Sequence, residues 1–152
     1  MTATNIERFN VLVGAIFAKL YENFPEPIEL NVLDFLEQMA TDEPTGTDHQ
    51  LATTKDNRFF VSTVLWLSNH DYLDSGSPLS NGAVMNCCLT ARTLELLKAM
   101  PPNLESKAPS LGDQLISATK EGTTNKMKEL ASDFLSRAVV FGTKAATDWA
   151  GS

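Results

Sequence analysis

Apolar residues near the start of the chain recur at the spacing of an α-helix. Thr4 and Glu7, in the sequence Thr-Asn-Ile-Glu, have the form of a capping box, which satisfies free backbone amides at a helix start. Pro25 and Pro27 prevent the helix from continuing past them. The pattern predicts a first helix of about 18 residues. Its apolar stripe is Ile6, Phe9, Val13, Ile16, Phe17 and Leu20.

Two further helices are predicted before the middle of the chain. Asn31 can cap a short second helix, and residues 41–48 have the composition of a loop. A third helix is predicted from Thr54 until the sequence Asn69-His70-Asp71 breaks the pattern. The apolar side chains of the second helix are Val32, Phe35, Leu36 and Met39, and those of the third are Phe60, Val64 and Leu67, with Phe59 and Trp66 widening the face.

The next segment predicts a β-hairpin. Tyr72-Leu73 forms a brief strand, residues 74–82 are rich in turn formers, and residues 83–89 alternate in polarity. Alternation places Ala83, Met85, Cys87 and Leu89 on one face and Val84, Asn86 and Cys88 on the other. The two cysteines are adjacent in this strand, so we expect two small buried side chains and no disulfide between them.

Three helices are predicted after the hairpin. Thr90 caps a helix that Pro101-Pro102 ends, and Ser110 begins another that Gly122 stops. Thr123 or Thr124 caps the last helix, whose apolar residues are Met127, Leu130, Ala131, Phe134, Ala138 and Phe141. The chain is therefore predicted to be mainly α, with one small β-hairpin.

The order helix, helix, helix, hairpin, helix is that of a winged helix with one further helix. Trp66-Leu67 ends a helix, residues 70–73 enter the hairpin, and Leu89-Thr90 leaves it into a helix that contains Leu96-Leu97. This pattern resembles that of small bacterial winged-helix proteins, including uncharacterised ones, over about residues 6–100. Those proteins often have Gly where this chain has Thr93.

The resemblance implies a winged helix-turn-helix core at residues 1–100. Residues 101–152 would then form a helical extension that packs on the core or mediates oligomerisation. The third helix takes the place of the recognition helix and residues 74–82 form the wing. DNA-binding members place that helix in the major groove and hold phosphates with basic side chains. The candidate DNA-binding residues are Lys55, Asn57, Arg58, Ser62 and Arg92.

The charge distribution weighs against DNA as the main partner. The net charge is −7, and residues 1–55 hold three basic and nine acidic side chains. The predicted wing contains no basic residue. An acidic surface repels nucleic acid, so DNA binding by a transcriptional regulator is kept as the alternative function.

The last helix offers a different kind of binding surface. Met127, Phe134 and Phe141 recur every seven residues, and with Leu130 they could contact a partner protein or a second copy. The same stripe could instead pack on the preceding residues as core. Both interpretations are kept.

Catalytic chemistry is not indicated by the sequence. His49 and His70 have no second ligand at metal spacing, and no glycine-rich phosphate loop or nucleophile motif occurs. We expect no enzyme activity, metal, cofactor or small-molecule substrate. No apolar stretch is long enough to span a membrane and no secretory signal is present, so a cytoplasmic location is expected. The leading interpretation is a non-catalytic winged-helix protein that binds another protein as an adaptor or oligomer.

Overall fold

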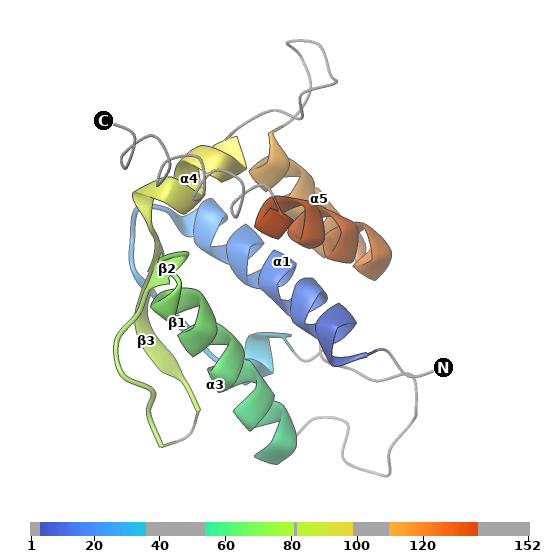
Figure 1. The fold of residues 1–152 in the computed structure, drawn as a ribbon. Helices are drawn as coiled ribbons and strands as arrows, with labels where there is room; N and C mark the ends of the chain where they lie inside the picture. The colour runs from blue at the N-terminus through green and yellow to red at the C-terminus, as the bar shows by residue number, and fades with distance from the viewer. Residues whose placement is uncertain (1–3, 36–53, 81, 99–109, 137–152) are drawn as a thin grey trace, which may run out of the picture.

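The structure is a computed structural model that describes residues 4–35, 54–80, 82–98 and 110–136. It confirms a mainly helical fold with a small antiparallel sheet (Figure 1). A further helix covers residues 124–136. The other elements are α1 (Asn5–Asn23), β1 (Ile28–Leu30), the 3₁₀ turn η1 (Val32–Phe35), α3 (Thr54–Asn69), β2 (Leu73–Asp74), β3 (Val84–Leu89), α4 (Ala91–Lys98) and α5 (Leu111–Glu121).

Helix α1 is the central element of the fold. Thr4 Oγ1 accepts a hydrogen bond from the Glu7 N–H at 3.2 Å, so the predicted cap is confirmed. Residues 11–18 are buried on every side of the helix, because α3 and the sheet lie on one side of α1 and α5 on the other (Figure 1). A helix that is buried all round must be apolar all round, which a single stripe did not predict.

The sheet has three strands in the order β1-β3-β2, all antiparallel to their neighbours. The predicted hairpin is confirmed, because Leu73 pairs with Leu89 and Asp74 with Cys88. Strand β1 was not predicted, since the sequence after Pro27 has no alternating run. It forms because β3 offers it a second edge for backbone hydrogen bonds.

A bulge in β3 overturns the predicted alternation of its side chains. Ile28 pairs with Cys87 and Leu30 with Val84, so β3 uses one more residue than β1 over this stretch. Asn86 takes up the extra residue with a φ of 56°, a conformation that Asn tolerates better than most residues. As a result Val84 and Cys87 are both buried, whereas Met85 and Asn86 are both exposed.

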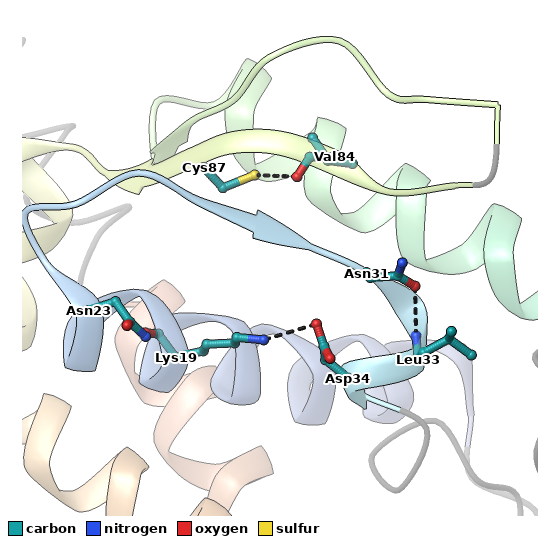
Figure 2. Close-up of polar contacts among 7 residues, drawn as sticks. All are labelled: Lys19, Asn23, Asn31, Leu33, Asp34, Val84 and Cys87. Atoms are coloured by element: carbon teal, nitrogen blue, oxygen red, sulfur yellow. Dashed lines mark hydrogen bonds and ion pairs between the residues drawn. The ribbon is translucent and has the colours of Figure 1, made fainter.

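Polar contacts tie η1 to α1. Asn31 Oδ1 accepts a hydrogen bond from the Leu33 N–H at 3.0 Å, as expected for the capping residue of a short helix. The Lys19 Nζ group lies 2.9 Å from Asp34 Oδ2 (Figure 2). The chain therefore returns along α1 after β1. The predicted continuation through Leu36 and Met39, and the loop at 41–48, lie outside the described residues.

The end of α3 is joined to the start of α4. Asp71 adopts a φ of 64° and the Tyr72 N–H donates to the Leu67 carbonyl at 2.9 Å. The sequence Asn69-His70-Asp71 therefore ends α3 as predicted. Thr90 Oγ1 donates to the Asp71 carbonyl at 2.8 Å and accepts from the Thr93 N–H at 3.3 Å. Thr93 is fully buried at this junction.

The C-terminal helices share the core of the preceding elements. Ser110 caps α5, and Gly122 ends it with a φ of 72°. The following helix lies so close to α1 that a Cβ on Gly14 would be 3.2 Å from the Met127 carbonyl oxygen. The Phe17 and Phe134 rings are 4.8 Å apart. Residues 110–136 therefore contribute to the same hydrophobic core as α1.

This packing makes Phe134 a test of the fold. We expect Phe134→Ala to lower the free energy of unfolding by about 3–5 kcal/mol, because a fully buried ring is replaced by a cavity. Leu33→Ala is the control, since Leu33 is 54 % exposed, and it should cost less than about 1 kcal/mol. Urea unfolding measures both. Equal losses would contradict this core.

Candidate functional site

An open groove lies between the N-terminal turns of α1 and the outer face of α3. Its volume is about 390 Å³. Large apolar side chains form most of its lining, and the polar residues there are small. The lining residues are Asn5, Ile6, Phe9, Phe59, Ser62, Thr63 and Trp66.

Two large side chains in this groove are exposed to solvent. Ile6 is 70 % exposed and Trp66 is 38 % exposed. The sequence placed Ile6 in the apolar stripe of α1, but Ile6 lies outside the buried core. The reason is that α1 is buried on every side only from Val11 onward, and α3 and the helix at 124–136 contact its first turns without enclosing them. Exposed apolar side chains that form a patch are typical of interaction sites.

The Trp66 indole is held by aromatic neighbours. It meets the Phe9 ring edge-on at 5.3 Å and stacks on the His70 ring at 4.1 Å and on the Tyr72 ring at 5.8 Å. His70 Nδ1 also lies 2.8 Å from the Trp66 carbonyl oxygen. Tyr72 in turn contacts Phe134 in the core, with 5.9 Å between the rings. The exposed indole is therefore fixed to the core before any partner binds, which lowers the entropy lost on binding.

Charged groups close the groove at the start of α3. The Arg8 guanidinium lies 4.6 Å from the centre of the Phe59 ring and 3.6 Å from Asp56 Oδ1. Inside the groove, Thr63 Oγ1 donates to the Phe59 carbonyl at 2.8 Å, so its hydroxyl is already paired. The groove thus offers an apolar surface, and Asp56 at the start of α3 is paired with a basic side chain.

The candidate DNA-binding residues do not gather at one place. Arg58 and Ser62 are exposed on α3, but Asn57 Oδ1 is buried and its amide fills the space that a Cβ on Gly82 would need. The Arg92 guanidinium lies 5.0 Å from the centre of the Tyr72 ring, beyond the end of α3. About 16 Å of helix separates Arg58 from that end. The Lys55 side chain lies outside the described part of the structure.

The proposed partner surface on the last helix is not available to a second chain. Met127 and Phe134 are fully buried, and Leu130 is 8 % exposed. This interface hypothesis is therefore wrong for those three residues, and its core alternative describes them correctly. Burial against α1 explains the difference, because a seven-residue stripe fits an intramolecular helix contact as well as an intermolecular one. Phe141 lies outside the described residues.

A second hollow of about 440 Å³ lies between α1, η1 and α5. Its charged side chains are paired with one another. Lys19 Nζ is 2.9 Å from Asp34 Oδ2, and Lys120 Nζ is 3.5 Å from Glu22 Oε1. Pairing leaves little unsatisfied charge to attract a ligand, so we regard the α1–α3 groove as the better candidate site.

The two cysteines differ in their surroundings. Cys87 is fully buried, and burial raises the pKa of its thiol to about 12. Its Sγ lies 3.5 Å from the Val84 carbonyl oxygen (Figure 2). Cys88 is half-buried, with its Sγ 3.5 Å from the Pro25 carbonyl oxygen. Both thiols are free. A thiol with a raised pKa is a poor nucleophile, so Cys87 is packed as a small apolar residue.

Within residues 4–35, 54–80, 82–98 and 110–136, no three His, Cys, Asp or Glu side chains are grouped so that they could hold a metal ion. In the same ranges no helix has both the length and the apolar character needed to cross a membrane.

Comparison with protein-family models, with curated proteins and with solved structures finds no match to this chain. The site is therefore interpreted from its geometry alone.

Thiol labelling tests the difference between the cysteines. At about one pH unit below the ordinary thiol pKa, we expect maleimide to label Cys88 in the folded protein and both thiols in denaturant. Raising the pH through 9.0 should leave Cys87 protected, because its pKa in the folded state is about 12. Cys88→Ser should abolish native labelling and Cys87→Ala should not. Rapid labelling of Cys88→Ser would contradict the buried position of Cys87.

Proposed function

We propose that this chain is a non-catalytic winged-helix protein that binds another protein through the groove between α1 and α3. The observation that carries the proposal is an exposed apolar patch fixed to the core, with Ile6 at 70 % and Trp66 at 38 % exposure. Trp is among the residues that most often dominate binding energy at interfaces, and its indole N–H can pair with a partner.

The winged-helix assignment rests on the order of the elements. A first helix and a strand precede α3, and α3 leads directly into the hairpin of β2 and β3. Strand β1 pairs with β3, which ties the start of the chain to the hairpin. Helix α4 follows the hairpin, as the resemblance requires. In this assignment α3 is the third helix of the motif and residues 74–82 are the wing.

Charge supports a protein partner over nucleic acid. Among the described residues, four ion pairs join basic side chains to acids of the same chain: Arg8 with Asp56, Lys19 with Asp34, Lys120 with Glu22 and Lys128 with Glu7. Specific DNA binding needs several phosphate contacts. A Lys or Arg that is paired with an acid of the same chain must break that ion pair before it can bind a phosphate.

The alternative, a DNA-binding transcriptional regulator, has the exposed Arg58 and Ser62 on α3 in its favour. Titration of a labelled DNA duplex at two salt concentrations tests it. We expect no binding at moderate salt. Binding at low salt that weakens steeply with added salt and with Arg58→Ala would instead favour DNA, because released counterions make phosphate contacts salt-dependent.

The groove itself is tested by placing a charge in it. We expect Ile6→Asp to abolish capture of the partner from an extract of the producing cells, because the change removes apolar contact surface and puts a strongly hydrated carboxylate against the apolar face of the partner. Leu79→Asp is the matched control, since Leu79 is 49 % exposed on the hairpin loop, away from the groove. The measurement is the set of proteins retained by each immobilised variant.

Both variants should unfold at the temperature of the parent protein, because both side chains are largely exposed. The informative result is a protein that the parent and Leu79→Asp retain and Ile6→Asp loses. If all three retain the same proteins, the α1–α3 groove is not the binding site.

A further inference from the structure

The charges around the groove indicate what kind of partner it fits. Arg58 is exposed, directly precedes the groove residue Phe59 and lies one helical turn before Ser62. Within the described part of the chain, no acidic group is paired with Arg58. The nearest acid along α3, Asp56, is paired with Arg8 at 3.6 Å. Among the residues that the structure describes, Arg58 therefore adds a positive charge without an acidic partner to one rim of the groove.

The opposite wall adds to this positive field. Asn5 and Ile6 belong to the first turn of α1, where backbone N–H groups have no acceptor within the helix. The N-terminal end of a helix has a partial positive charge for this reason. Glu7 in the same turn is engaged by Lys128, with 3.5 Å between Oε2 and Nζ. A carboxylate brought to this groove would meet favourable charges on both rims.

The dimensions of the groove match a helix. Its α3 wall presents Phe59 and Trp66, which are seven residues apart, or about 10 Å along the helix axis. A helical ligand places apolar side chains at the same interval on one face, at i and i+7. Two helices already form the walls, so a third can pack its ridge of side chains between them.

We propose that the occupant is an amphipathic helix of another protein, whose apolar face enters the groove and whose acidic side chain pairs with Arg58. This inference rests on the proposed function and specifies its partner. The apolar side chains supply the affinity, because the groove offers mainly apolar surface for burial. The acidic side chain sets the direction of the helix and improves specificity.

A displayed peptide library tests this inference and does not require the partner protein to be identified. The library consists of helical peptides of about five turns with apolar residues at i, i+4 and i+7. The positions beside them are varied among Glu, Lys, Gln and Ala. The full-length protein is the bait. Peptides that also bind the Ile6→Asp variant are discarded, because they bind outside the groove. We expect the retained peptides to be enriched in Glu near one end.

A charge swap then tests the pairing. The best retained peptide, made synthetically, should bind Arg58→Glu about five- to tenfold more weakly than the parent, because attraction at the rim becomes repulsion. Replacing its Glu by Lys should restore binding to Arg58→Glu. Lys126→Glu is the control charge reversal, since Lys126 is exposed on the last helix outside the groove, and it should bind as the parent does.

The outcomes separate this inference from the proposed function. Peptides that need Ile6 but show no acidic preference, and that bind Arg58→Glu normally, would overturn the inference and keep the groove as a binding site. A library that yields no peptide dependent on Ile6 would overturn both. Light scattering shows whether the protein alone forms a dimer. If it does and Ile6→Asp dissociates that dimer, the groove binds a second copy of the chain and the inference is overturned.

Discussion

The burial of α1 on all sides is the constraint on which the rest of the structure depends. A helix with no solvent-facing side from Val11 to Ala18 needs neighbours all around it, and α3, the sheet, α5 and the helix at 124–136 supply them. Gly14 allows the 124–136 helix to approach closely, because a larger residue would press on the Met127 carbonyl oxygen at 3.2 Å. The C-terminal helices are therefore part of the fold, since without them one side of α1 would be exposed.

The same arrangement explains why the groove exists. The helices that cover the middle of α1 do not enclose its first turns, so Ile6 remains exposed and Phe9 is only partly buried. Trp66 extends this apolar surface across α3, and its contacts with Phe9, His70 and Tyr72 hold it in place. Exposed apolar surface has a cost in solubility, and a fixed aromatic side chain within it is typical of a surface that binds a partner.

Most helices could be predicted from the sequence because their signals are local. Thr4, Ser110 and Gly122 act at helix ends through contacts with residues close in sequence, and each was predicted correctly. Strand β1 could not be predicted, because it depends on pairing with β3, which is distant in sequence. The bulge at Asn86 was missed for the same reason, since its register is set by the partner strand.

The site could not be predicted because the sequence shows which residues are apolar but does not show which segments pack against them. Ile6 and Met127 both occupy apolar stripes at helical spacing, yet Ile6 is 70 % exposed and Met127 is fully buried. The sequence left the interface and core interpretations of Met127 open, and it did not distinguish Ile6 from the buried members of its stripe.

A one-dimensional pattern shows which face of a helix is apolar, and only the packing of distant segments decides which part of that face remains uncovered. For the same reason Arg58 and Arg92 looked equivalent in the sequence, although Arg58 directly precedes the groove residue Phe59 and Arg92 lies over the Tyr72 ring beyond the end of α3. The apolar surface and the charge next to it must therefore be considered together, because the charge alone does not distinguish a phosphate from an acidic side chain.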